Sequence, residues 1–188
     1  MKKIVLLGLV ICLFMWRMGG IAEAVPVTWS YNGHSYEVIS ANSTTWAEAR
    51  TQAHDKGAGW DLATITSIEE QNFITNLLGP APGNLVEYYI GGVETSSNVY
   101  EWVTGEAFSF SFWGAGEPNN PMIEPYIALD GRHPNWGWND YTGAGSSFIL
   151  GYVAELHITN SVPEPGTILL LGSGLAGLLF RRKKKEIL

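Results

Sequence analysis

Residues 117–140 read EPNNPMIEPYIALDGRHPNWGWND, and they say more about this protein than any other stretch of its sequence. Carboxylate and amide side chains gather at residues 117–120, at Glu124 and at residues 139–140, whereas the stretch contains no cysteine and a single histidine, His133. Oxygen ligands without a soft partner suit Ca²⁺ better than Zn²⁺ or Cu²⁺. The stretch therefore predicts a calcium site.

Glycine, proline and asparagine dominate residues 114–137, which indicates a long loop with little regular structure. Pro118 restrains the backbone between Glu117 and Asn119, and the peptide bond before it is a candidate for the cis form. Residues 126–129, YIAL, predict a short strand within the loop. A loop of this length inside a compact domain is usually functional.

The first half of the chain carries local signals for a hairpin and two helices. The pair Asn32-Gly33 lies between two alternating segments and predicts a β-hairpin. Thr45-Trp-Ala-Glu48 and Ser67-Ile-Glu-Glu70 each match a helix capping box and precede apolar residues at helical spacing. Gly57 is expected to end the first helix and Gly79-Pro80 the second.

The second half predicts strands. Residues 88–93 and 100–103 read as buried strands, and residues 108–112, FSFSF, alternate with the period of a third. Residues 147–156 predict a terminal strand. We therefore expect an α+β fold in which two helices pack on small antiparallel sheets and a long loop carries the site.

The N-terminal end reads as a targeting segment. Two lysines and a short apolar run lead to Ala22-Glu-Ala24, so residues 1–24 are predicted to be a cleaved secretory signal peptide. A retained N-terminal anchor is the alternative, although the apolar run is short for a membrane span. Cys12, the single cysteine, lies in this segment. The mature domain, residues 25–161, is expected to fold without disulfides.

Residues 162–188 begin with Val-Pro-Glu-Pro, continue in an apolar run and end in a basic cluster, RRKKK at 181–185. This order resembles the PEP-CTERM sorting signal of Gram-negative bacteria, a short transmembrane helix plus a basic tail whose charge favours the cytoplasmic side. The resemblance implies processing by an exosortase, transient inner-membrane anchoring, and export to the envelope, cell surface or extracellular matrix. It also associates the chain with exopolysaccharide and biofilm. A permanent single-pass anchor is the alternative.

The predicted mature domain is strongly acidic. Residues 25–161 hold three Lys or Arg and fifteen Asp or Glu side chains, a formal net charge of −12. Such a domain repels nucleic acid and anionic lipid surfaces, so we expect no nucleic-acid partner and membrane contact only through the terminal segments.

The order of the parts from Trp29 to Leu156 resembles a C-type lectin-like domain. The matching segments are TWAEAR at 45–50, LATI at 62–65, SIEEQNF at 67–73, YIGG at 89–92, WVTG at 102–105, Trp113, EPN at 117–119 and WND at 138–140. The family's disulfides are absent, and Tyr126 stands where relatives often have a cysteine.

The resemblance implies which residues bind the metal and the sugar. The five predicted ligands of both are Glu117, Asn119, Glu124, Asn139 and Asp140. The family associates Glu-Pro-Asn with mannose, glucose and N-acetylglucosamine, and Gln-Pro-Asp with galactose. A second calcium site found in some relatives is not expected, because Asn120 stands where that site needs an aspartate.

These oxygens suit sugar binding for a chemical reason. Ca²⁺ accepts about six to eight oxygens at flexible geometry. The five side chains and the backbone carbonyl of Asp140 would leave two positions, which a vicinal diol can occupy. The hydroxyls would then exchange charge-assisted hydrogen bonds with the same carboxylates, which are stronger than neutral ones.

Other interpretations remain open from the sequence. The 118–121 and 139–140 segments are also ordinary turn sequences. Trp136 and Trp138 are candidates either for the core or for stacking on a sugar. The four histidines are scattered and are interpreted as surface residues: His34, His54, His133 and His157.

An enzyme is not expected. The chain lacks a Gly-x-Ser-x-Gly nucleophile motif. Glu117 and Glu124 could form a glycosidase pair, but their polar surroundings do not favour the raised pKa that a general acid needs. The competing non-enzymatic interpretation is a structural or adhesive matrix protein that binds a protein partner or uses calcium only for stability.

Overall fold

The computed structural model describes residues 25–157. The predicted signal peptide and sorting segment lie outside these residues. The elements are β1 (Val27–Thr28), β2 (Ser35–Ser40), α2 (Trp46–Asp55), β3 (Trp60–Leu62), α3 (Ile68–Leu78), β4 (Glu87–Ser96), β5 (Val99–Trp102), β6 (Tyr126–Asp130), the 3₁₀ turn η1 (Pro134–Trp136), β7 (Trp138–Tyr141) and β8 (Ile149–Leu156). None of the helices in this part of the chain is long and apolar enough to cross a membrane.

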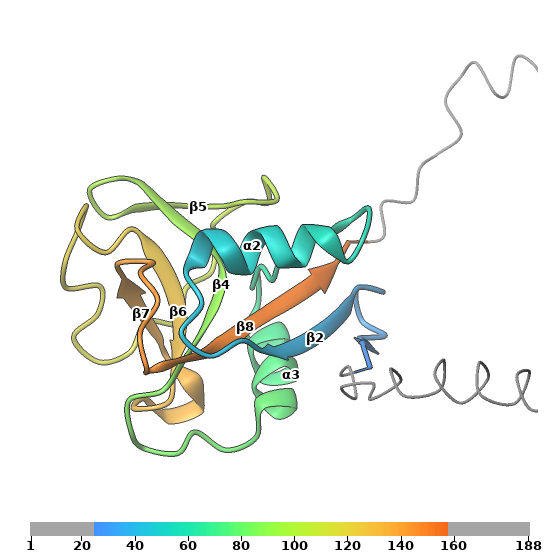
Figure 1. The fold of residues 1–188 in the computed structure, drawn as a ribbon, viewed down its shortest axis with the longest axis horizontal. Helices are drawn as coiled ribbons and strands as arrows, with labels where there is room; N and C mark the ends of the chain where they lie inside the picture. Colours follow the sequence, from blue (N-terminus) through green and yellow to red (C-terminus); the bar gives the residue numbers. More distant parts are fainter. Residues whose placement is uncertain (1–24, 158–188) are drawn as a thin grey trace, which may run out of the picture. The chain divides into compact units, whose positions relative to one another are not determined.

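The strands form one connected sheet in the order β1-β2-β8-β4-β6-β7, with β3 paired to β8 and β5 to β4 (Figure 1). The last strand, β8, runs antiparallel to β2 with Tyr36 opposite Glu155, and parallel to β4. Because β1 and the end of β8 both pair with the start of β2, the two ends of the described chain lie on the two sides of that strand. The expected α+β architecture with two helices is confirmed, and the single parallel pair is a feature that local patterns do not reveal.

Both helices begin where the sequence predicts. Thr45 caps α2 in a full capping box, because its side chain accepts from the Glu48 amide while Glu48 accepts from the Thr45 amide. Ser67 caps α3 in the same way, but the reciprocal bond is missing. The carboxylate of Glu70 instead accepts hydrogen bonds from the Tyr36 hydroxyl and the Thr66 amide. The capping box predicted at Ser67 is therefore only half formed, because Ser67 caps the helix but the Glu70 side chain does not bond back to the Ser67 amide.

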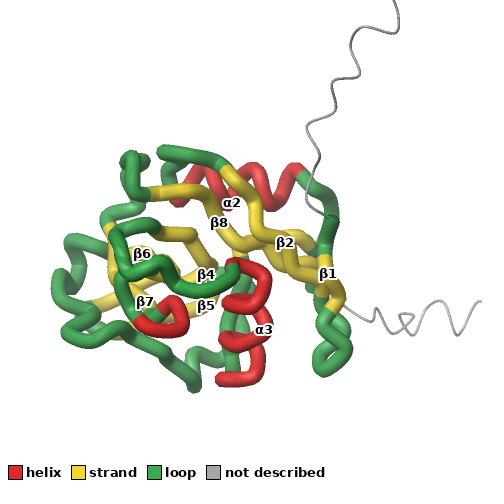
Figure 2. The backbone as a smooth tube through the Cα atoms, turned by 90° about the horizontal axis from the view of Figure 1, so that it is seen from below, coloured by secondary structure: helices red, strands yellow, loops and turns green. Residues whose placement is uncertain are grey.

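The helices pack on different sides of β2 and β8, as Figure 2 shows. In β8, Val153 faces the cluster that includes Ile74 of α3, whereas Tyr152 and Ala154 face the cluster that includes Trp46 of α2. Successive strand side chains point to opposite faces, so a strand covered on both sides needs apolar residues at every position. This accounts for the apolar run at residues 149–154 of β8.

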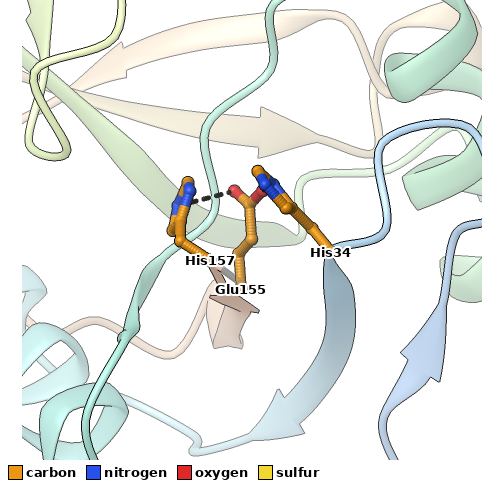
Figure 3. A group of neighbouring side chains, drawn as sticks. All are labelled: His34, Glu155 and His157. Atoms are coloured by element: carbon orange, nitrogen blue, oxygen red, sulfur yellow. Dashed lines mark hydrogen bonds and ion pairs between the residues drawn. The ribbon is translucent and has the colours of Figure 1, made fainter. Parts of the chain in front are cut away.

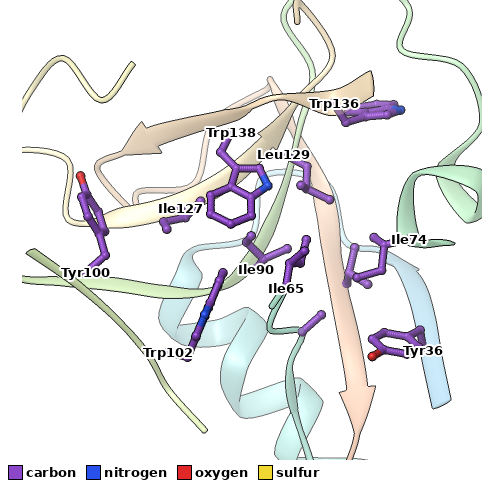
Figure 4. Close-up of a cluster of buried hydrophobic side chains, with 12 residues drawn as sticks. Tyr36, Ile65, Ile74, Ile90, Tyr100, Trp102, Ile127, Leu129, Trp136 and Trp138 are labelled. Carbon is purple, nitrogen blue, oxygen red and sulfur yellow. The ribbon is translucent and has the colours of Figure 1, made fainter. Parts of the chain in front are cut away.

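Trp138 lies in the middle of the larger cluster, between Ile127 and Leu129 and close to Trp102 (Figure 4). Its side chain is fully buried, and its indole N–H donates to the Gln71 side chain at 2.9 Å. The strand that carries Trp138 is thus fixed from its first residue, and the residue two positions later, Asp140, is fixed with it.

One local prediction fails, and one of the alternative interpretations is excluded. Residues 108–112 form no strand, although their burial alternates as a strand's would, because the three phenylalanines pack against the core cluster while the serines stay exposed. Residues 139–140 are not a turn but belong to β7, which pairs with β6. In both cases long-range pairing, which a local pattern does not encode, decides the outcome.

Candidate functional site

The Glu-Pro-Asn segment is tied to β7 through Asp140. The Asp140 side chain is completely buried, and its two oxygens accept hydrogen bonds from the backbone amides of Asn119 at 3.0 Å and Asn120 at 2.8 Å. Since a buried carboxylate must be compensated, these amides both satisfy Asp140 and fix the loop. The Glu-Pro-Asn segment and Asp140, about twenty residues apart in the sequence, therefore meet.

Glu117 lies next to Asp140 and carries an uncompensated oxygen. The peptide bond between Glu117 and Pro118 is cis. Burial raises the pKa of Glu117, and the charge and close contact of Asp140 raise it further. Its Oε2 atom is buried and has no hydrogen-bond partner. Arg132 weakly opposes this shift, but its guanidinium is hydrogen-bonded to Asp130.

Asn120 bridges two of the predicted ligands. Its side-chain amide donates to the Glu124 carboxylate at 2.6 Å and to the side-chain oxygen of Asn119. The positive end of an amide dipole here lies between two oxygens that the sequence assigns to a cation. The Asn120 side chain is neutral, but the partial positive charge of its NH₂ group takes the place of a cation beside these two oxygens.

Asn139 points away from this group. It occupies the opposite face of β7 from Asp140, as expected for neighbouring residues on a strand. Its side-chain nitrogen donates to Glu87 at 2.8 Å. Glu87 is fully buried, its other oxygen has no hydrogen-bond partner, and burial raises its pKa to about 7.

The structure thus joins four of the five predicted residues through a chain of contacts: Glu117, Asn119, Glu124 and Asp140. The carboxylates of Glu117, Glu124 and Asp140 are not among the groups of three that lie within 4.8 Å of one another in the described part of the chain. The donor set nevertheless fits Ca²⁺, because it is made of oxygens alone and includes the unsatisfied Glu117 atom.

Sequence reasoning missed Glu94, which holds the loop from the β4 side. Its buried carboxylate accepts from the Asn98 amide at 2.6 Å and from the Met122 amide, and its own amide donates to the Pro125 carbonyl at 2.7 Å. The sequence does contain a signal for this role. Glu94 directly follows the predicted buried strand at residues 88–93, and a carboxylate buried there needs hydrogen-bond donors.

Packing holds the other side of the loop. Tyr126, the first residue of β6, stacks on Trp46 with ring centroids 4.4 Å apart. This packing and the backbone hydrogen bonds to the buried carboxylates of Asp140 and Glu94 together hold the loop.

The aromatic and histidine alternatives are also decided. Trp136 and Trp138 are buried at 4% and 0% exposure, so neither is available to stack on a sugar. Of the histidines, His54 is exposed, as expected. The view of His34 and His157 as scattered surface residues is wrong, because the two are half-buried and in contact with each other.

A surface hollow of about 490 Å³ lies elsewhere, between the end of α3 and η1, and is lined by residues such as Thr75, Ala81 and Asn135. None of the five predicted ligands lines it. A sugar held through a metal ion needs an exposed coordination position rather than a deep cavity, so the hollow does not bear on the candidate site.

With this geometry in view, the fold and the loop together define a C-type lectin-like domain. The Lectin C-type domain model matches residues 42–147, and the PEP-CTERM protein-sorting motif matches residues 161–184. The chain belongs to the C-type lectin domain family and carries a PEP-CTERM sorting motif. Lectin domains of this family typically bind Ca²⁺ and carbohydrate, and its members are generally binding proteins rather than enzymes. The sorting motif indicates an exported protein that is processed at the cell envelope.

Similar proteins include "C-type lectin domain family 4 member E" from Homo sapiens, which is 30% identical over 69% of this chain and 58% of its own length. The chain therefore spans less than two thirds of that relative. The C-type lectin domain of murine dendritic cell inhibitory receptor 2, solved in complex with N-glycan, superposes with a TM-score of 0.54 at 26% identity, covering 65% of this chain and 89% of that one.

A calcium-independent type II antifreeze protein also shares the fold, with a TM-score of 0.55 at 19% identity over 70% of this chain and 95% of that one. At this identity the likeness concerns the fold alone. The family fold is therefore compatible with calcium-independent function, and the donor set of this chain has to decide the matter.

Proposed function

We propose that this domain is an exported, Ca²⁺-dependent carbohydrate-binding module of the mannose and glucose type. The ion would be held by Glu117, Asn119, Glu124, Asn139 and Asp140. When bound, it would supply coordination positions for two neighbouring sugar hydroxyls. The residues themselves would orient those hydroxyls through charge-assisted hydrogen bonds.

The observation that carries the proposal is the buried, unpartnered Oε2 atom of Glu117 beside the buried Asp140. Two ionised carboxylates in close contact repel each other, and either a proton or a cation relieves that repulsion. Arg132 is engaged by Asp130, and the Asn120 amide reaches Asn119 and Glu124 rather than Glu117. A divalent ion answers this need.

Binding would require two local changes. The Asn120 amide would leave the gap between Asn119 and Glu124, and the Asn139 oxygen would join the site. The second change would turn the Asn139 side chain away from the face of β7 on which its nitrogen donates to Glu87, and this hydrogen bond would then break.

Calcium titration of the full chain by calorimetry, followed by mannose and galactose in calcium and in EGTA, tests the proposal. We expect one calcium site and mannose binding near a millimolar dissociation constant, about −4 kcal/mol, lost in EGTA. Glu117→Gln should abolish both, whereas Glu101→Gln, at an exposed glutamate of β5, should change neither. Mannose binding that persists in EGTA would refute it.

Selectivity provides a second test. The family associates Gln-Pro-Asp with galactose, so the double substitution Glu117→Gln and Asn119→Asp should shift preference from mannose toward galactose while calcium binding persists. An unchanged preference with intact calcium binding would show that these two residues do not read the sugar.

A second candidate is a structural or adhesive matrix protein. The Asn120 bridge favours it, because this bridge satisfies the loop without an ion. In that case calcium would raise the melting temperature without creating sugar affinity, or would not bind. For either function, we propose that an exosortase processes the sorting segment and that the domain acts in exopolysaccharide or biofilm at the surface of a Gram-negative cell, after transient inner-membrane anchoring.

A further inference from the structure

A histidine cluster lies where β2 begins and β8 ends, and it shares no residue with the Glu-Pro-Asn loop. His34 directly precedes β2, Glu155 belongs to β8 and His157 follows β8. Tyr36 pairs with Glu155 in the antiparallel ladder, so continuing the register places His34 opposite His157. Residues two apart on a strand share a face. The three side chains therefore meet on one face, as Figure 3 shows.

The distances in the cluster are short. His34 Nδ1 lies 2.6 Å from one Glu155 oxygen, and His157 Nε2 lies 3.3 Å from the other. All three ligand atoms lie within 4.8 Å of one another, which no other group of three histidine, cysteine or acidic side chains does among residues 25–157. Glu155 is 1% exposed, and the imidazoles are 19% and 16% exposed.

The Nε2 atom of His157 is only partly satisfied by its contact with Glu155. It is buried, and although it lies at ion-pair distance from Glu155 it makes no hydrogen bond. Two ligands of a tetrahedral zinc ion lie roughly 3.3 Å apart, given metal–ligand bonds of about 2.0–2.1 Å. The separation between His157 and Glu155 matches that value, and the hydrogen bond between His34 and Glu155 is one that a metal would replace.

A second layer of contacts orients the carboxylate. Thr64 donates to Glu155 from its backbone amide at 2.9 Å and from its hydroxyl at 3.1 Å, and the same hydroxyl contacts Glu106. Partners of this kind fix metal ligands and add to affinity. Glu106 also adds negative charge near both imidazoles.

We propose that His34, Glu155 and His157 bind a zinc-like transition-metal ion, with a fourth position open to water or to a further ligand. Two imidazoles and one carboxylate suit such an ion, whereas the oxygen-only loop suits calcium. The ion would join β2 to β8 in a domain whose described part contains no cysteine. This site is separate from the proposed sugar site and does not depend on it.

Zinc titration of the full chain after removal of metal with a chelator tests the inference. We expect one zinc ion to bind with a micromolar or tighter dissociation constant, to raise the melting temperature and to persist in millimolar Ca²⁺. Substituting His34→Gln or His157→Gln should weaken zinc binding at least tenfold. His54→Gln is the matched control, because His54 is half-exposed and outside the cluster, and it should leave zinc binding unchanged.

Zinc binding that is absent from the wild-type chain, or equal in all three variants, would overturn the inference. A substitution at either cluster position changes packing as well as a ligand, so X-ray absorption spectroscopy of the wild-type chain loaded with one zinc equivalent gives a test without mutation. Two imidazoles in the first shell support the site, and a shell of oxygens alone overturns it.

Discussion

The candidate calcium site and the histidine cluster treat buried carboxylates in opposite ways. In the histidine cluster, burial alone would raise the pKa of Glu155, but His157 and His34 outweigh it and lower the pKa to about 2. At the candidate calcium site, burial and the neighbouring Asp140 raise the pKa of Glu117. The first carboxylate already has its positive partners, and the second still lacks one.

The difference follows from where the ligands lie. The histidine cluster is built on two paired strands, whose register sets the positions of all three side chains before any ion arrives. The candidate calcium site is assembled from a loop and one strand, and two of its amides are turned to other partners. We infer that a metal would fill the first site with little rearrangement and would reorganise the second, which costs part of the binding free energy.

The largest effect that separates the two sites is expected for Asp140→Asn. The substitution places an NH₂ group against a backbone N–H, which should cost about 2–3 kcal/mol of unfolding free energy and weaken calcium binding by roughly 100-fold or more. Denaturant unfolding and calorimetry measure both. Zinc affinity should stay unchanged, and a loss of zinc binding in this variant while it remains folded would mean that the sites are not independent.

A smaller effect is expected for Glu94→Gln, which tests whether the loop is held from β4. The buried carboxylate accepts from the amides of Asn98 and Met122, and one of these bonds should be lost at a cost of about 1–2 kcal/mol. Glu101→Gln on the exposed side of β5 is the control. Equal unfolding free energies for the two variants would show that Glu94 does not hold the loop.

The smallest effect is expected at Asp61, whose carboxylate is already paired with the side chains of Arg50 and His54. Arg50 contacts both oxygens of Asp61 at 3.0 Å, and His54 contacts one of them. Burial opposes ionisation, but these hydrogen bonds prevail and lower the pKa of Asp61. Asp61 therefore stabilises the domain above its unfolded pKa of about 4, and the contribution is lost as pH falls through the lower folded pKa.

Replacing Asp61 with Asn should cost about 1 kcal/mol at pH 7 and less in acid. Unfolding measured between pH 7 and pH 3 checks this, with the wild-type chain and the variant converging at the acid end. A gap that widens on acidification would contradict the sign. Asp61 thus serves as a standard for a carboxylate that needs no metal, against which Glu117 can be compared.

Much of the fold could be predicted because its signals are local. Thr45 and Ser67 cap helices through atoms three residues away, and Trp138 lies in the core as its neighbours suggest. The strand predicted at residues 108–112 does not form and the strand β7 was not predicted, since pairing depends on segments far along the chain.

The two sites differ in the same respect. The motif at residues 117–119 and Asp140 could be found by resemblance, but the turning of Asn139 toward Glu87 could not. The histidine cluster was missed because His34 and His157 lie more than a hundred residues apart. Only the register of β2 and β8 brings them together.

The strand order has one further consequence. The described chain begins beside β1 and ends after β8, both of which pair with β2, whereas the Glu-Pro-Asn loop leads into β6 on the other side of the same sheet (Figure 1). Attachment through either end of the domain therefore leaves the opposite rim unobstructed. Many copies fixed to one surface in this way would all offer that rim to a polymer in the surroundings, and weak individual contacts would add up to firm adhesion.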